Sequence, residues 1–235
     1  MERKFAFVSG NAKGIGKAIT IRLIEKGYFV PIHYRKSEEQ ALAFKREIKE
    51  KYSLDVPIYK ADLLDDKQTI ELVSEITIKN KVIDVIVNNV GDYLYKSILE
   101  TNFYEWKYII DSNLNTSFLL TSAFLPYIKR RIVFLGFAGT NMIKASPYTT
   151  AYDISKVGVL IYAKSLAKLL AKKGITVNVI GVGVAENSVT QPVKEIPMGR
   201  TATLNEICDV FEFIISDKSD YITGQLIEVA GGWKL

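Results

Sequence analysis

The stretch Lys4-Phe-Ala-Phe-Val-Ser-Gly-Asn-Ala-Lys-Gly-Ile-Gly16 decides the fold, because an apolar run breaks into three glycines and then continues in a helical pattern. It predicts a strand, a tight loop and a helix over residues 15–26. We expect Gly10 to permit the sharp exit from the strand, Gly14 to let a ligand approach the backbone, and Gly16 to let the helix pack closely on the sheet. Because the N-terminus of a helix attracts phosphate, this stretch is typical of a dinucleotide site or of an ordinary strand-to-helix turn.

The length and composition predict one domain over residues 1–235, since 235 residues with 48% hydrophobic content can form one sizeable core. The 31 basic and 26 acidic residues are scattered, so a net charge of +5 gives little support for a nucleic-acid partner. The single cysteine, Cys208, and the single histidine, His33, argue against disulfides and a structural metal. No apolar stretch reaches membrane-spanning length and no signal peptide is evident, so we expect a cytoplasmic protein without a membrane partner.

Beyond the first helix, apolar patterns alternate between strands and helices. Strands are predicted over residues 28–34, 56–60, 82–87, 131–135, 176–180 and 226–229. Helices are predicted from a capping box at Ser37 to about 51, from Asp65 to about 79, from Asn102 to about 127, from about 148 to 173, and from a capping box at Thr203. This alternation predicts an α/β Rossmann fold, with a doubly wound parallel sheet of about seven strands and helices on both faces.

Polar or glycine-rich segments follow the predicted strands. They are residues 9–16, 33–37, 62–63, 88–91, 136–140 and 181–188. Ligands of doubly wound sheets bind outside the carboxyl ends of the strands, so these segments favour a nucleotide crevice, although turns are enriched in such residues anyway.

Tyr152 and Lys156 are four residues apart in a helical pattern, so both side chains project from one face. A lysine ammonium beside a phenol lowers the pKa of the tyrosine, which then exchanges protons near neutral pH. A chance pair on a helix surface is the alternative, because the chain has 13 tyrosines. The position after the fifth strand, beside the predicted crevice, favours a catalytic pair.

These motifs together resemble the short-chain dehydrogenase/reductase superfamily over nearly the whole chain. Ser9-Gly10-x-x-x-Gly14-Ile15-Gly16 is similar to its Thr-Gly-x-x-x-Gly-Ile-Gly, and Asn88-Asn89-Val90-Gly91 is similar to its Asn-Asn-Ala-Gly. Asn113 matches the asparagine of its proton relay, and Tyr152 with Lys156 matches its catalytic pair. Segments that resemble the end of 3-oxoacyl-acyl-carrier-protein reductases are Pro197-Met-Gly-Arg200, Tyr221-Ile-Thr-Gly-Gln225 and Gly231-Gly232.

The resemblance implies hydride transfer with a nicotinamide cofactor. It implies that Tyr152 is the acid/base, that Lys156 holds the ribose hydroxyls and the tyrosine, and that Asn113 holds a water chain. The residues expected to bind the cofactor are Gly10, Lys13, Gly14, Ile15, Gly16, Tyr34, Arg35, Lys36, Ser37, Asp62, Leu63, Asn89, Gly91, Tyr152, Lys156, Gly183 and Val184.

The second strand predicts NADP(H) over NAD(H). It ends Ile32-His33-Tyr34-Arg35-Lys36-Ser37, without an acidic residue to bind the ribose 2′-hydroxyl. Lys13 and Arg35 instead offer positive charge where a 2′-phosphate would lie. The less favoured alternative for each is a solvated surface cation.

Three departures from the superfamily pattern bear on the substrate. Leu135-Gly136-Phe137 stands where Ile-Ser-Ser is usual, so the serine that polarises a carbonyl is missing, as in pteridine reductases, unless Ser146, Thr149 or Thr150 replaces it. The aspartate of pteridine reductases is absent from Phe137 and Gly139. Val182-Gly183 replaces the usual Pro-Gly, and the segment over 184–197 predicts a small lid.

The favoured function is therefore an NADPH-dependent reductase of a C=O, C=N or conjugated C=C bond in a small metabolite or a carrier-bound acyl chain. The alternatives are a pteridine reductase-like enzyme and a non-catalytic NADP(H)-binding regulator. Tyr93 and Tyr95 are equally typical of surface aromatics and of groups that stack on a ring. Surplus apolar positions over residues 104–127 and 148–173 predict a homo-oligomer, either a dimer or a tetramer.

Overall fold

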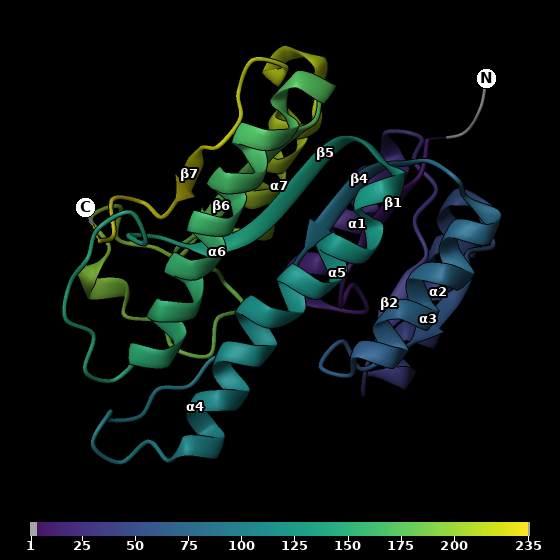
Figure 1. Ribbon diagram of the computed structural model, residues 1–235. Helices are drawn as coiled ribbons and strands as arrows, with labels where there is room; N and C mark the ends of the chain where they lie inside the picture. The colour runs from purple at the N-terminus through teal and green to yellow at the C-terminus, as the bar shows by residue number, and fades with distance from the viewer. Residues whose placement is uncertain (1–3, 235) are drawn as a thin grey trace.

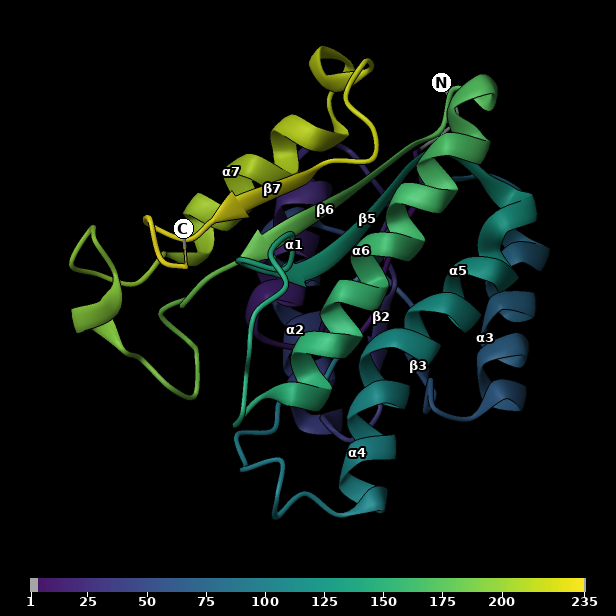
Figure 2. The same cartoon turned by 60° about the vertical axis from the view of Figure 1, so that its left-hand side comes forward.

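The computed structural model describes residues 4–234, which form a parallel sheet between two layers of helices (Figures 1 and 2). Five strands are hydrogen-bonded in the order β1-β4-β5-β6-β7, with bounds Ala6–Val8, Ile83–Asn88, Ile128–Phe137, Thr176–Val182 and Leu226–Val229. The remaining two strands, β2 (Ile32–Tyr34) and β3 (Ile58–Lys60), pair with each other. A parallel bridge between Phe5 and Phe29 places this pair beside β1. The predicted α/β Rossmann fold is confirmed.

The helices cover both faces of the sheet because alternate strand residues face opposite ways. Ala6 and Val8 of β1 belong to the core beneath one helical layer, whereas Phe7 belongs to the other core. The first layer comprises α1 (Gly14–Glu25), α2 (Glu38–Tyr52) and α7 (Leu204–Ile215). The second layer comprises α3 (Asp66–Lys79), α5 (Thr116–Phe124) and α6 (Thr150–Leu170), and α4 (Phe103–Ile110) extends beyond it (Figure 2).

Three of the four predicted helix caps are present. The Asp65 side chain accepts hydrogen bonds from the second and third backbone amides of α3, and Asn102 and Thr203 form reciprocal capping boxes. The capping box predicted at Ser37 is wrong, because Ser37 has φ −91° and ψ 59°, outside the extended region from which a side chain caps. α2 therefore begins without a side-chain cap.

The helix predicted from Asn102 to about residue 127 is not one regular helix. Between α4 and α5, residues Asp111–Asn115 form a π-helical turn, and a 3₁₀ turn closes the segment over Leu125–Tyr127. The Thr116 hydroxyl donates to the Asp111 carbonyl oxygen at 2.6 Å, across the wide turn. A π-turn accommodates one extra residue and is frequent at functional sites. Asn113 lies in the middle of it.

The loops after β5 and β6 and the C-terminal turn gather beyond the same edge of the sheet in both views (Figures 1 and 2). β5 begins three residues before the predicted strand, at Ile128, and ends two residues after it, at Phe137. Phe137 is thus the last residue of a long strand and lies at the carboxyl edge, where ligands of such sheets bind.

Within residues 4–234, no helix is long and apolar enough to cross a membrane, and no cluster of three or more His, Cys, Asp or Glu side chains could hold a metal ion. Cys208 is a buried free thiol.

Candidate active site

Two adjoining cavities lie at the carboxyl edge of the sheet. The glycine-loop cavity, of about 810 Å³, is bounded by the loop after β1 and the ends of β2, β3 and β4. The tyrosine cavity, of about 340 Å³, is bounded by the end of β5, the start of α6 and the segment after β6. Ile15, Asn89 and Gly91 line both cavities. Predicted cofactor residues that line the glycine-loop cavity are Gly10, Lys13, Gly14, Ile15, Gly16, Tyr34, Arg35, Lys36, Ser37, Asp62, Leu63, Asn89 and Gly91.

The glycine loop is shaped by close backbone approaches. Gly10 has φ +64°, which favours glycine, and a Cβ there would lie 2.8 Å from Val90 Cγ2. A Cβ on Gly16 would lie 2.6 Å from Asn89 Nδ2 and 2.8 Å from the Gly10 carbonyl oxygen. Gly16 is therefore required for packing against the loop and Asn89, rather than against the sheet as we expected. The Asn89 amide also donates to the Ser9 carbonyl oxygen at 2.8 Å, which ties β4 to the loop.

The buried His33 side chain is hydrogen-bonded to this loop. Its Nδ1 accepts a hydrogen bond from the Gly10 amide at 2.9 Å, and its side chain is buried. Burial lowers the pKa of His33 to about 4, so the ring is neutral at pH 7 and remains an acceptor. The sequence pattern did not predict this role, although the one histidine of the chain lies at the end of the second strand.

The residues of the glycine-loop cavity fit a dinucleotide. Among residues 4–234, no side chain caps the start of α1, so its first N–H groups are free to bind phosphate oxygens. Lys13 occupies the position before α1 and is exposed, and Arg35 and Lys36 follow β2. These cations suit the extra phosphate of NADP(H).

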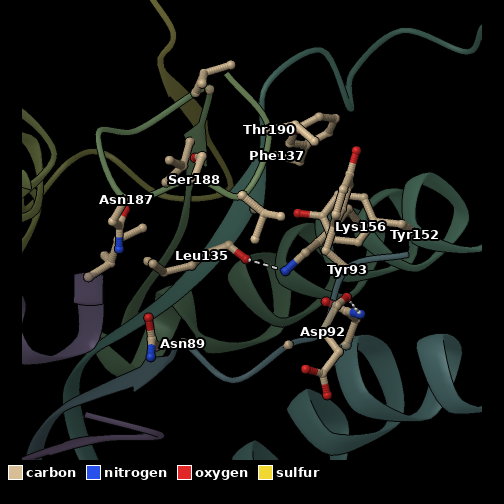
Figure 3. A pocket seen from close by; sticks show the side chains of 18 of the residues that line it. Asn89, Asp92, Tyr93, Leu135, Phe137, Tyr152, Lys156, Asn187, Ser188 and Thr190 are labelled. Atoms are coloured by element: carbon tan, nitrogen blue, oxygen red, sulfur yellow. Dashed lines mark hydrogen bonds between the residues drawn. The ribbon is translucent and has the colours of Figure 1, made fainter. Parts of the chain in front are cut away.

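The three predicted catalytic residues, Asn113, Tyr152 and Lys156, all line the tyrosine cavity. Figure 3 shows Tyr152 and Lys156 there. Lys156 Nζ donates to the Leu135 carbonyl oxygen at 3.0 Å and lies 5.6 Å from the centroid of the Tyr152 ring. A Cβ on Gly91 would lie 2.3 Å from Asn113 Oδ1 and 3.4 Å from Lys156 Nζ. A side chain at position 91 would therefore displace the asparagine. The remaining predicted cofactor residues, Gly183 and Val184, also line this cavity.

Asn113 is oriented by the π-turn and by the loop after β4. Its Nδ2 donates to the carbonyl oxygens of Asp92 at 2.8 Å and Ile109 at 3.0 Å. Its Oδ1 is buried and has no hydrogen-bond partner among the described residues. An unsatisfied buried acceptor beside Lys156 suits a water molecule or a ligand hydroxyl.

Burial controls the ionisation of the catalytic pair. It lowers the pKa of Lys156 to about 8 and raises the pKa of Tyr152, with smaller upward contributions from the charges of Asp153 and Tyr93. The predicted lowering of the Tyr152 pKa is thus wrong, because the phenol is buried and desolvation raises its pKa. Tyr152 is a protonated phenol at pH 7.

Comparison with known proteins agrees with this geometry. Residues 10–234 match the family described as enoyl-(acyl carrier protein) reductase. The chain belongs to the short-chain dehydrogenase/reductase superfamily. This short-chain oxidoreductase is 32% identical over 240 residues to the 3-oxoacyl-[acyl-carrier-protein] reductase FabG of Staphylococcus aureus, with 97% of each chain covered. It is 32% identical over 249 residues to FabG of Aquifex aeolicus, with 99% of this chain and 98% of the relative covered.

Two solved structures share the fold, each with a TM-score of 0.91, 24% identity, and 99% of this chain and 98% of the other covered. One is a mutant short-chain dehydrogenase/reductase of Serratia marcescens, and the other is a blue fluorescent protein from a metagenomic library in complex with NADPH.

Phe137 faces the tyrosine cavity of this short-chain dehydrogenase/reductase. Its ring meets Tyr152 edge to face at 5.2 Å and 78°, and Trp233 at 5.6 Å and 83°. None of the hydroxyls of Ser146, Thr149 and Thr150 lines the cavity, and Thr150 Oγ1 donates to the Ser146 carbonyl oxygen at 2.6 Å. The hydroxyl side chains that do line it are Tyr93, Tyr152, Ser188 and Thr190.

Several lining residues were not predicted individually. Tyr93 meets Tyr152 edge to face at 5.0 Å, whereas Tyr95 stacks on Tyr148, so the two candidate tyrosines have different surroundings. The segment after β6 contributes Asn187, Ser188, Val189 and Thr190, and the C-terminal turn contributes Trp233. Residues 187–190 lie within the segment over 184–197 that predicts a small lid, whereas no sequence pattern pointed to Trp233.

Proposed function

We propose that this short-chain oxidoreductase uses NADPH to reduce a C=O, C=N or conjugated C=C bond of a small metabolite or a carrier-bound acyl chain. The convergence of Asn113, Tyr152 and Lys156 in a cavity continuous with the glycine-loop cavity supports this best. A pure nucleotide-binding regulator would not need a buried acid/base pair. In this proposal residues 1–235 form one NAD(P)-binding domain. The expected location of the protein in the cell is the cytoplasm.

Protonation is the step that the chain's own residues perform. Tyr152 stays protonated at pH 7 because burial raises its pKa, so its hydroxyl can donate a proton to the reduced substrate. Lys156, fixed by the Leu135 carbonyl, lies beside the phenol and stabilises the phenolate that remains. Asn113 Oδ1, which has no partner among the described residues, is an acceptor for a water through which the proton can be replaced. A nicotinamide cofactor, when bound, supplies the hydride. Because Tyr152 is protonated before the reaction, the site favours reduction of the substrate over oxidation.

The test is oxidation of NADPH against oxoacyl thioesters, quinones, diketones and dihydropterins. Turnover with at least one substrate, lost in Tyr152→Phe, supports the proposal. Binding of NADPH without turnover across the panel would instead support the regulator.

NADPH should be preferred to NADH. Lys13→Gln removes an exposed cation beside the glycine loop without altering backbone geometry, so we expect the KM for NADPH to rise severalfold and the KM for NADH to stay within about twofold. Equal catalytic efficiency of the wild type with both cofactors would refute this preference.

A flat substrate is the second candidate, and Phe137 favours it. Phe137, Tyr93 and Trp233 place three aromatic rings around the cavity, and no serine hydroxyl is supplied by the end of β5. Aromatic rings bind planar molecules, and a C=N bond in a pterin-like ring depends less on an oxyanion donor than a ketone does. Faster turnover of a dihydropterin than of every oxoacyl thioester would select this candidate.

We further propose a symmetric homo-oligomer. Apolar side chains remain exposed on the outer helical layer, with relative exposures of 55% for Phe118 on α5, and 61% and 74% for Ile161 and Leu169 on α6. Exposed apolar side chains gathered on one helical layer favour an interface between copies of the chain. Light scattering at micromolar concentration should give a dimer or tetramer, and a monomer would contradict the proposal.

A further inference from the structure

Arg35 is shared among three acidic or phenolic groups from different elements. Its Nη2 donates to Tyr108 Oη on α4 at 3.1 Å and lies 3.7 Å from Asp92 Oδ2, after β4. Its Nη1 lies 3.6 Å from Asp62 Oδ1, after β3. The Tyr108 hydroxyl in turn donates to the Asp92 carboxylate. The arginine expected to bind a 2′-phosphate thus already has two counter-ions.

The charge of this cluster opposes a phosphate. One guanidinium faces two carboxylates, so Arg35, Asp62 and Asp92 together carry a net charge of about −1 at neutral pH. All three line the glycine-loop cavity, and their side chains are 30–42% exposed. A doubly charged 2′-phosphate must therefore draw Arg35 away from its carboxylates before it gains the full attraction of the guanidinium.

Of the two competing carboxylates, Asp92 is the one that is tied to other elements of the fold. Its side chain is held by the Tyr108 hydroxyl, and its carbonyl oxygen accepts from Asn113 Nδ2 at 2.8 Å. The competing contact is therefore fixed on the side chain by α4 and on the backbone by the π-turn. Asp62 Oδ1 instead accepts from the Leu64 amide at 3.1 Å within its own turn.

We propose that Asp92 is a specificity-determining residue that competes with the 2′-phosphate of NADP(H) for Arg35. The inference rests on the proposed function. It assigns an unfavourable contribution to NADP(H) binding to one carboxylate, which follows β4 and lies 3.7 Å from Arg35. Removal of that charge releases Arg35 to the phosphate, whereas NAD(H), which has no 2′-phosphate, gains little.

The test is calorimetric binding of NADP⁺ and NAD⁺ to the wild-type protein, Asp92→Asn, Arg35→Gln and the double variant. Asp92→Asn keeps the shape of the side chain and should lower the Kd for NADP⁺ by about two- to fivefold, the range for a partly exposed ion pair, with the Kd for NAD⁺ changed by less than twofold. In the Arg35→Gln background, the same substitution should leave the Kd for NADP⁺ unchanged, because the effect acts through Arg35.

Glu50→Gln is the matched control. It removes the same charge from an exposed residue near the far end of α2, about 18 Å along the helix axis from its start. Its Kd for NADP⁺ should equal that of the wild type. Asp92→Ser provides a second variant if Asp92→Asn does not fold.

Three results would overturn the inference. They are an unchanged or raised Kd for NADP⁺ in the Asp92 variants, a tightening that persists in the Arg35→Gln background, and an equal tightening in Glu50→Gln. In each of these cases the proposed function still stands, provided that the wild-type protein binds NADP⁺. Failure of the wild type to bind NADP⁺ at all would overturn the proposed function as well.

Discussion

The glycine-loop cavity and the tyrosine cavity each enclose one buried base, and the two bases behave differently. Burial lowers the pKa of His33 to about 4 and that of Lys156 to about 8. At pH 7, His33 is therefore neutral and accepts a hydrogen bond from Gly10, whereas Lys156 stays mostly protonated and donates to Leu135. Desolvation lowers both pKa values, but it leaves a neutral hydrogen-bond acceptor at His33 and a charged donor at Lys156, because the two side chains start from different pKa values.

The largest effect should come from the tyrosine cavity. Tyr152→Phe removes only the hydroxyl, so turnover should fall by about 10²–10⁴-fold, the range for loss of a general acid. The Kd for NADPH should stay close to the wild-type value, since the ring and its edge contacts with Tyr93 and Phe137 remain. Stopped-flow turnover and fluorescence titration measure the two quantities. Near-normal turnover would show that another group supplies the proton.

Lys156→Met should stabilise the protein while it abolishes activity. Lys156 has a folded pKa of about 8 and an ordinary value of 10.5, so keeping it charged in the folded state costs up to about 3 kcal/mol below pH 8. Between pH 8 and 10.5 the unfolded chain binds the extra proton, so wild-type stability rises with pH relative to the variant. Urea unfolding at pH 7 and pH 10 measures this difference. A variant that is less stable than the wild type at pH 7 would contradict it.

In the glycine-loop cavity, His33 should lower the stability of the folded protein at acidic pH. The pKa of His33 is about 4 in the folded protein and 6.5 ordinarily. As the pH falls from 6.5 to 4, the imidazole is therefore protonated in the unfolded chain while it stays neutral in the folded one. This should cost up to about 3 kcal/mol of stability at pH 4. His33→Asn keeps an acceptor for the Gly10 amide without titrating, so its urea midpoint should lose less on acidification. Parallel acid profiles would rule out His33 as the cause.

The smallest effect should come from the aromatic wall. Phe137→Ser restores a hydroxyl at the end of β5, and Phe137→Ala is its control, because it removes the ring without adding a donor. Ketone reduction by the serine variant should exceed that of the alanine variant by about tenfold, below the full value of a preorganised oxyanion donor. Relative rates on a diketone and a dihydropterin measure this. Strong wild-type ketone reduction, equal in both variants, would mean that another hydroxyl already acts, for example Thr190.

The glycine-loop cavity was the easier of the two to predict from sequence. One wall of it is local, since Gly10, Gly14 and Gly16 lie within one strand-loop-helix unit and their spacing alone indicates the turn. Tyr152 and Lys156 were also predicted, because a four-residue spacing on a helix fixes their common face. The alternating pattern of strands then placed both groups at one edge of the sheet.

The tyrosine cavity depends on contacts that no local pattern encodes. Trp233 and Tyr93 both line it, although they lie 140 residues apart in the chain. Only the folded structure shows that Tyr93 lines the cavity and that Tyr95 does not. The direction of the Tyr152 pKa shift was wrongly predicted for the same reason. Sequence spacing shows which charge lies near a phenol, but the depth of burial, which raises the pKa of Tyr152, is set by the whole fold.

The π-turn at Asp111–Asn115 sets the rotational phase of α4 relative to α5. Each residue of a helix turns the chain by about 100° and advances it by about 1.5 Å, so deleting one residue here would restore a regular helix and rotate α4 by about that angle. Tyr108 would then leave the side of the helix that faces Arg35, while α5 could keep its place against the sheet. One residue inserted or lost in this turn is therefore a means by which a reductase of this kind changes its cofactor selectivity by moving Tyr108, a residue that does not line the cofactor cavity.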